Sequence, residues 1–245
     1  MKFEMWSIWH FVYMISPFIV FLLLYLVTCK KSEKVKNITG IILGAVSLLI
    51  LIVRNVDIYL RNGMDLEVIP LQVCHVGSIV TGLALMLRKR WLLITAFCFN
   101  MIPAFLAMIF ANSLENYSEL LRIRPQTYIW GHIFIVVCSL YGVFIYKPKA
   151  TKKDLIYSLS TIFSILIVAI VCNSALRLIP EWEPNYFYLY NYKGTPLKFL
   201  YNAFPVTNWG WFSINFLYVI ILVLVFIVVY FALLYLTKLI AKKLK

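Results

Sequence analysis

The strongest constraint on this chain is a series of seven long apolar segments separated by polar connections. A bilayer core about 30 Å thick is crossed by roughly 20 apolar residues in a helix. The segments cover residues 8–28, 38–60, 69–87, 91–111, 127–146, 155–176 and 209–236. The sequence therefore predicts an all-α polytopic membrane protein with seven transmembrane helices, forming a single membrane domain over residues 1–245.

Composition supports a membrane protein. Hydrophobic residues make up 63% of the chain and charged residues 13%, compared with roughly 45 to 50% and about 25% in soluble domains. The first segment resembles a signal peptide, but Cys29-Lys30-Lys31-Ser32 follows it in place of a small-residue cleavage site. We therefore expect this segment to remain as a helix.

The distribution of basic residues predicts the orientation. Fifteen Lys and Arg residues lie in the connections after the first, third and fifth segments and in the C-terminal tail, and seven lie on the opposite side. By the positive-inside rule, the N-terminus is then outside and the C-terminus is in the cytoplasm. We expect the protein to lie in the plasma membrane. The formal charge of +13 is explained by this topology. We therefore expect membrane lipids, and not nucleic acid, as the partner.

The last outer connection, residues 177–208, is long and rich in aromatic residues. Tyr and Trp favour the headgroup layer of a membrane because they combine an apolar ring with a polar tip. We expect this connection to lie on the membrane as a lid, with a short interfacial helix at Pro196–Phe204.

The chain has five cysteines and no CxxC pair. No metal-ligand spacing, Gly-rich phosphate loop or HExxH pattern occurs. The sequence therefore predicts neither disulfides nor a metal site, and no cofactor.

Polar residues inside the segments gather at one depth. Ionisable groups in a membrane cost about 2.5 to 3.5 kcal/mol on insertion scales and by default mark a functional site. With alternating segment directions, the outer half of the membrane contains His10, Arg54, Asp57, Cys74, His75, His132, Asn173 and Arg177. This layer predicts a central polar cavity open to the outer side. Two other interpretations stay open. The polar residues lie near span ends, where they reach headgroups and water without forming a cavity. Arg54 and Asp57 neutralise each other as an i, i+3 pair.

Cys74 is the candidate nucleophile of this layer. On a helix it shares a face with Ser78, whereas His75 is turned by about 100° toward the face of Gln72. A base for Cys74 must therefore come from another helix, and His132 begins the fifth segment at matching depth. An imidazole that takes its proton turns a thiol into a nucleophile. The alternative is a small buried apolar residue, the role expected for Cys29, Cys98, Cys138 and Cys172.

Three motifs resemble those of the YwaF-like bacterial integral membrane proteins. They are Pro70-Leu71-Gln72-Val73-Cys74-His75, Trp130-Gly131-His132 and Asn185-Tyr186-Phe187-Tyr188-Leu189. That family is in turn similar to the eukaryotic transacylase that moves polyunsaturated acyl chains onto ether lysophospholipids. The resemblance implies a seven-helix fold with a central cavity, in which Cys74 carries an acyl group as a thioester and His132 assists. It also implies that the motif Asn185–Leu189, which includes Tyr188, closes or lines the outer mouth.

The chain also departs from the family pattern. Many bacterial members have histidine at the position of Gln72, and a Gly-Pro-Trp-Pro-Trp pattern where this chain reads Ala203-Phe204-Pro205-Val206-Thr207-Asn208-Trp209-Gly210-Trp211. These departures bear on substrate identity more than on fold.

Two functional hypotheses follow. The first is an acyltransferase or transacylase acting on lipids, in which amides such as Gln72 and Asn173 stabilise the developing oxyanion. The second is a non-enzymatic carrier or receptor whose ligand is held by Arg54, Asp57, His132 and Arg177. An assembly partner of another membrane protein is a third reading. The acyl donor, the acceptor and the oligomeric state are left open by the sequence.

Overall fold

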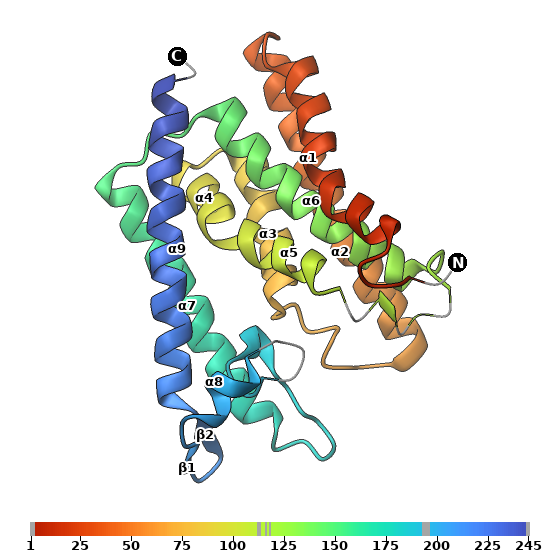
Figure 1. Ribbon diagram of the computed structural model, residues 1–245, viewed down its shortest axis with the longest axis vertical. Helices are drawn as coiled ribbons and strands as arrows, with labels where there is room; N and C mark the ends of the chain where they lie inside the picture. The colour runs from red at the N-terminus through yellow and green to blue at the C-terminus, as the bar shows by residue number, and fades with distance from the viewer. Residues whose placement is uncertain (1–2, 112–113, 116, 118, 193–196, 244–245) are drawn as a thin grey trace.

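The computed structural model describes residues 3–111, 114–115, 117, 119–192 and 197–243. These form a helical bundle with one small β-hairpin at its lower end (Figure 1). Lys2, Lys193 and Lys245, which enter the charge count, and Pro196, which begins the predicted interfacial helix, lie outside the described residues.

The order of elements follows the predicted segments. The helices are α1 Ile8–Thr28, α2 Glu33–Asn62, α3 Val73–Leu87, α4 Arg90–Thr95, the π-helix η1 Ala96–Asn100, α5 Met101–Ile109, α6 Ile123–Tyr146, α7 Lys152–Leu176, the 3₁₀ turn η3 Tyr186–Tyr188, α8 Lys198–Asn202 and α9 Phe216–Lys243. The strands are β1 Thr207–Trp209 and β2 Phe212–Ile214. The short helix α8 lies inside the predicted interfacial helix and confirms a helix there, whereas its place at the membrane surface stays a prediction.

Six helical stretches are long and apolar enough to cross a membrane. They are α1, α2, the continuous run of residues 90–109, α6, α7 and α9. The third predicted segment forms α3, which has only 15 residues and at 1.5 Å per residue extends about 22 Å. A mostly helical polytopic membrane protein is thus confirmed, whereas the count of seven spans stays a prediction.

The seventh predicted segment began too early. Residues 209–214 belong to the hairpin of β1 and β2, in which Trp209 pairs with Phe212 around Gly210. Gly210 has a φ of 57°, which glycine adopts without a Cβ clash. Helix α9 starts at Phe216 and continues to Lys243. The all-α prediction was therefore wrong for this hairpin, because hydropathy does not separate short apolar strands from helices.

Helices α2, α3 and α6 form the tightly packed core of the bundle. A Cβ atom added to Gly44 of α2 would lie 2.6 Å from the carbonyl oxygen of Gly82 in α3. Such close approach of backbones at small residues is a common way to pack helices within membranes, where apolar surface gives no preference for protein over lipid.

Helices α3 and α6 run parallel and in register. A Cβ atom on Gly77 of α3 would lie 3.2 Å from Cδ1 of Ile135 in α6. Two turns further along both helices, a Cβ atom on Gly142 of α6 would lie 3.5 Å from Cδ2 of Leu85 in α3. The two contacts have offsets of 58 and 57 in residue number, so positions about 58 apart face each other along the pair.

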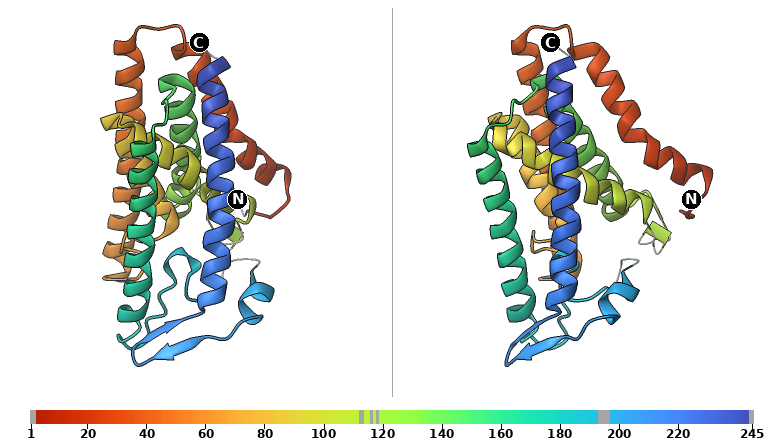
Figure 2. Two further views of the ribbon diagram at one scale, coloured as in Figure 1. Left: turned by 90° about the vertical axis from the view of Figure 1, so that its left-hand side faces the viewer. Right: turned by 60° about the vertical axis from the view of Figure 1, so that its left-hand side comes forward.

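The connections with most of the basic residues gather at one end of the bundle. The hydroxyls of Tyr141 and Tyr146, at the end of α6, donate to the carbonyl oxygen of Lys36 near the start of α2. Arg90 pairs with Asp154 at 3.3 Å and joins the starts of α4 and α7. The C-terminus of α9 lies at the same end (Figure 2). This arrangement agrees with alternating spans, and the membrane side of each end stays a prediction.

Helices α7 and α9 form a less densely packed arm beside this core (Figure 1, Figure 2). A chain of hydroxyls joins the arm to α4: Thr95 and Ser158 lie 2.7 Å apart, and Tyr230 of α9 donates to Ser158 at 2.8 Å. Phe226 of α9 packs on Phe99 of the π-helix, with ring centroids 4.5 Å apart.

Candidate active site

Cys74 lies in the first turn of α3, at the end of the core where the described loops gather. It is a free, partly buried cysteine. Gln72 is the N-cap residue of α3, but its side chain makes no cap hydrogen bond. Ser78, one turn further along, is buried. His75 is also buried, at 2% exposure, which agrees with the prediction that it lies on another face from Cys74.

The register of α3 and α6 puts Cys74 and His132 at the same level. Gly77 faces Ile135, and moving three residues toward the start of each parallel helix leads to Cys74 and His132. His132 is 3% exposed. In the described part of the chain no hydrogen bond joins the Cys74 thiol to the His132 ring. Catalytic hydrogen bonds are often long before substrate binds and tighten in the reacting complex.

His132 has a defined tautomer. Its Nδ1 lies 2.7 Å from the carbonyl oxygen of Tyr128, one turn earlier in α6. A carbonyl oxygen only accepts hydrogen bonds, so Nδ1 carries the proton and donates it. In a neutral imidazole Nε2 is then the unprotonated nitrogen, and it is available as a base.

Arg54 of α2 is the charge closest to these groups. Its guanidinium acts electrostatically on Cys74, His75 and His132. Arg54 pairs with Glu67 at 2.7 Å and also donates to the Glu67 carbonyl oxygen at 3.1 Å. The second oxygen of the Glu67 carboxylate pairs with Arg124 at the start of α6. This network ties the connection before α3 to both α2 and α6.

Asp57 does not neutralise Arg54. Its carboxylate pairs with Arg61, one turn further along α2, at 2.8 Å. The proposed i, i+3 pairing was therefore wrong, because Glu67 from the following connection offers Arg54 a carboxylate on the side facing the core. Asp57 itself is 9% exposed.

His10 is held at the edge of the polar layer by two hydrogen bonds. Its Nε2 donates to the carbonyl oxygen of Met108 at 2.9 Å, and its Nδ1 accepts from the backbone N–H of Trp6 at 3.0 Å. Both ring nitrogens are thus occupied. This arrangement tethers the start of α1 to α5, and it leaves neither nitrogen free for a ligand.

Asn173 fastens the outer aromatic connection to the end of α7. Its amide nitrogen donates to the carbonyl oxygen of Tyr186 at 2.9 Å, and its amide oxygen accepts from the Tyr186 N–H at 2.7 Å. The Tyr186 hydroxyl donates to the carbonyl oxygen of Leu66 at 2.9 Å. Burial raises the pKa of Tyr186 to about 12, so this phenol stays a neutral donor at physiological pH. The Asn173 amide thus uses its oxygen and one N–H to hold the backbone of Tyr186.

The turn after Tyr186 reaches toward Cys74. Phe187 and Tyr188 have φ angles of 58° and 54°, a costly conformation that persists only where the surroundings impose it. Phe187 stacks on Phe99, and the Tyr188 phenol lies within electrostatic range of Cys74. Burial raises the pKa of the Tyr188 phenol. This connection therefore lies near the start of α3, and its role as a lid stays a prediction.

Asn185 and Arg177 shape the rest of the connection. The Asn185 amide oxygen accepts from the backbone N–H groups of Tyr190 and Asn191, at 3.2 and 3.1 Å, which closes the turn. The Arg177 guanidinium, which is exposed, lies 3.9 Å from the centroid of the Tyr190 ring. Both side chains thus stabilise the loop through contacts within it.

Three buried side chains near Cys74 have polar atoms with no hydrogen-bond partner in the described structure. They are both ring nitrogens of His75, both amide atoms of Asn100 and the hydroxyl of Tyr13. Tyr13 acts electrostatically on Cys74. Sequence reasoning missed Tyr13, Asn100, Glu67 and Arg124, because an uncharged residue in an apolar segment, or an ion in a loop, gives no signal of its own.

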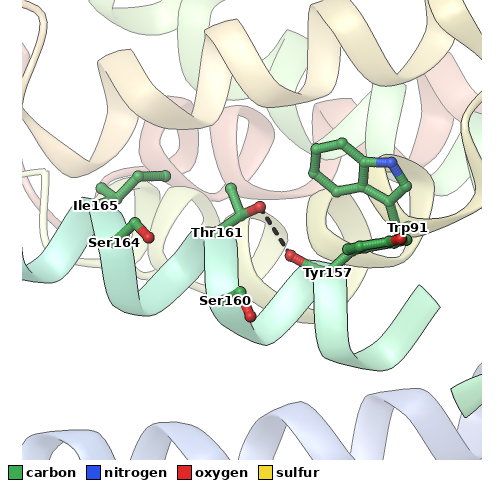
Figure 3. A pocket seen from close by; sticks show the side chains of 6 residues that line it. All are labelled: Trp91, Tyr157, Ser160, Thr161, Ser164 and Ile165. Atoms are coloured by element: carbon green, nitrogen blue, oxygen red, sulfur yellow. Dashed lines mark hydrogen bonds between the residues drawn. The ribbon is translucent and has the colours of Figure 1, made fainter. Parts of the chain in front are cut away.

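Two surface hollows lie elsewhere on the molecule. One, of about 480 Å³, runs along α7 beside the start of α4 (Figure 3), and is lined by Trp91, Tyr157, Ser160, Thr161, Ser164 and Ile165. The other surrounds Phe199 of α8. Neither is lined by Cys74 or His132, so the central polar cavity stays a prediction. Among the described residues no three His, Cys, Asp or Glu side chains gather as a metal site.

The family profile that matches this chain is that of the TMEM164 family, over residues 5–236. The chain belongs to the TMEM164 family. No curated protein and no solved structure matches it. The TMEM164 family is a family of transmembrane proteins, in agreement with the membrane-spanning helices. The matched region of this TMEM164 family member includes Cys74, His132 and the turn at Tyr188.

Proposed function

We propose that this protein is a membrane-embedded acyltransferase or transacylase that acts on lipids through a thioester on Cys74, with His132 as the base. The observation that carries this proposal is the parallel register of α3 and α6, which puts the two side chains at one level. The Nδ1–H bond to the Tyr128 carbonyl supports the role of His132, since it leaves Nε2 free to take a proton.

The reaction uses only these groups and two lipids. Nε2 of His132 takes the thiol proton while Sγ of Cys74 bonds to the carbonyl carbon of a phospholipid ester. The ester C–O bond then breaks, and the departing lysolipid oxygen takes the proton back from His132. A hydroxyl of a second lysolipid gives its proton to His132, and its oxygen attacks the thioester carbon. The C–S bond then breaks, and the departing sulfur of Cys74 takes the proton back from His132. Splitting the transfer through a covalent intermediate replaces one difficult step by two easier ones.

The surrounding residues support this chemistry. Arg54 provides a positive charge near the thiol, and its position is fixed by its pairing with Glu67, which also pairs with Arg124. Gln72, Ser78 and Tyr188 are the proposed lining of the acyl pocket. Under the carrier or receptor alternative, Arg54 and Asp57 would bind the ligand. Both already have carboxylate or guanidinium partners, which favours the enzyme.

We further propose that α3 is a seventh span, that the N-terminus is outside, and that the protein lies in the plasma membrane. A central polar cavity open to the outer side is part of the same proposal. We also propose the YwaF-like relationship and the likeness to the ether-lipid transacylase, and the motif resemblance around Cys74 and His132 supports both.

The test is acyl labelling of purified protein with a phospholipid carrying a labelled acyl chain. We expect a hydroxylamine-sensitive adduct on the wild type and on Cys172→Ala, a matched control that removes another partly buried free cysteine. Cys74→Ala should carry none, and His132→Gln should label about 10²- to 10⁴-fold more slowly, as for loss of a general base. Equal labelling of Cys74→Ala would end the proposal, and saturable lipid binding without any adduct would favour a carrier.

A further inference from the structure

The π-helix in the fourth segment puts an unexpected polar group beside α3. The N–H of Met101 bonds to the carbonyl oxygen of Ala96, five residues earlier, so η1 contains the wider turn of a π-helix. Ser139 of α6 donates a second hydrogen bond to the same carbonyl at 2.9 Å. Such single π turns are rare in helices and occur often at functional sites. Here the turn ends at Asn100.

The amide of Asn100 is buried and unsatisfied. Asn100 is 2% exposed, and neither its amide nitrogen nor its amide oxygen has a hydrogen-bond partner in the described structure. A buried polar group without a partner costs about 1–3 kcal/mol, and no water in the lipid core offsets this cost. A leucine would fill the same space without this penalty. The stability of the fold therefore does not explain why an asparagine occupies this position.

The position of Asn100 relates it to Cys74. A Cβ atom on Gly77 would lie 3.7 Å from the Cβ of Asn100, so the asparagine lies directly against α3. Gly77 follows Cys74 by three residues, and side chains three apart on a helix have Cβ atoms about 5–6 Å apart. The Asn100 amide and an acyl group on Sγ of Cys74 both extend beyond their Cβ atoms and can bridge this interval. Gly77 places no side chain of its own between them.

We propose that the side-chain N–H of Asn100 donates a hydrogen bond to the acyl carbonyl oxygen during attack by Cys74. The inference rests on the proposed acyl transfer. When Sγ bonds to the carbonyl carbon, the π electron pair of the C=O bond moves to oxygen, and the thiol proton passes to His132. Asn100 stabilises that oxyanion. As the C–O bond of the ester breaks, the pair returns to the carbonyl and the hydrogen bond weakens.

This assignment replaces Asn173 as the predicted donor. One N–H and the oxygen of the Asn173 amide are bonded to the backbone of Tyr186. The Asn100 backbone is part of the π turn, and its side-chain amide has both hydrogen-bonding groups free among the described residues. A donor fixed before the reaction stabilises the developing charge without reorganisation, and the loss of one such donor slows acyl transfer by about 10² to 10³.

The test compares Asn100→Leu with Asn173→Leu and with the wild type, using p-nitrophenyl butyrate as the acyl donor. We expect Asn100→Leu to unfold at or above the wild-type temperature, because it removes an unpartnered amide, and Asn173→Leu to unfold at a lower temperature. Acylation of Cys74 should fall about 10²- to 10³-fold in Asn100→Leu. Alkylation of Cys74 by iodoacetamide, which forms no oxyanion, should stay within about twofold of wild type. Asn100→Ala is measured in parallel, since it removes the amide without having to fit a larger side chain.

Each contrary result has a distinct meaning. Wild-type acylation rates in both Asn100 variants would refute the role of Asn100 and leave the Cys74 thioester intact. A parallel fall in alkylation would show that Asn100 controls access, and a loss of stability in both variants would show a structural role, so either result overturns the inference. No adduct on the wild type would refute the proposed function itself.

Discussion

The core of α2, α3 and α6 and the arm of α7 and α9 are held together by different kinds of contact. Within α6, 67% of the most apolar window is buried in protein, compared with 17% in both α7 and α9. The core helices approach closely through Gly44, Gly82 and Gly142. The arm is held by the hydroxyls of Ser158 and Tyr230 and by the aromatic contact of Phe226, and most of its surface is left for lipid.

The core positions the two candidate residues, whereas the arm carries the connection that lies near them. The close-packed pair of α3 and α6 fixes the level of Cys74 and His132, which a rigid scaffold does more precisely than a loop. The arm contributes the nearby connection, since Asn173 at the end of α7 holds the turn at Tyr186.

The largest expected effect comes from breaking the close approach in the core. In Gly44→Leu the new side chain meets the Gly82 carbonyl, whose backbone has no room to move aside. We expect a loss of about 3 kcal/mol in the free energy of unfolding, measured by SDS titration in mixed micelles. Gly131→Ala is the control, because the nearest atom to its new Cβ is 3.8 Å away, an ordinary contact. Similar stability of the two variants would mean that the core is not packed as described.

The second effect concerns the link between the arm and the loop. Asn173→Ala leaves the N–H and C=O groups of Tyr186 without their partner, at a cost of about 1–3 kcal/mol. We expect faster hydrogen exchange in residues 177–192 with little change in α3 or α6, measured by mass spectrometry. Asn202→Ala, an exposed asparagine of α8, should leave exchange unchanged. Equal acceleration in the core helices would contradict the separation of the two regions.

The smallest effect concerns the hydroxyl chain within the arm. Tyr230→Phe removes the hydrogen bond to Ser158, and single hydrogen bonds between helices in membranes contribute about 0.6 kcal/mol on average. We expect a loss of that size in the SDS titration. Tyr235→Phe, at a position that is 64% exposed, should change nothing. A loss as large as that of Gly44→Leu would place the arm within the cooperative core.

Local signals in the sequence predicted the helices well and their partners poorly. The first segment matches α1 at residues 8–28, because hydropathy adds up over consecutive residues and needs no knowledge of neighbours. The pairing of Arg54 was predicted wrongly, since Glu67 reaches it only after the chain turns between α2 and α3. The apolar hairpin at Trp209 was taken as helix for a similar reason: strand pairing depends on a partner strand that a hydropathy window does not include.

The sequence by itself determined a multi-pass membrane protein. It also predicted a common depth for the polar residues, with Cys74 and His132 as candidates. These depend on the free energy of transferring side chains from water to lipid, which is a property of each stretch of sequence by itself. The tertiary structure decided that the two residues share a level, that the Asn173 amide is bonded to Tyr186 and that the Asn100 amide is free. Those facts depend on which helices cross and at what register, and such contacts join residues far apart in the chain.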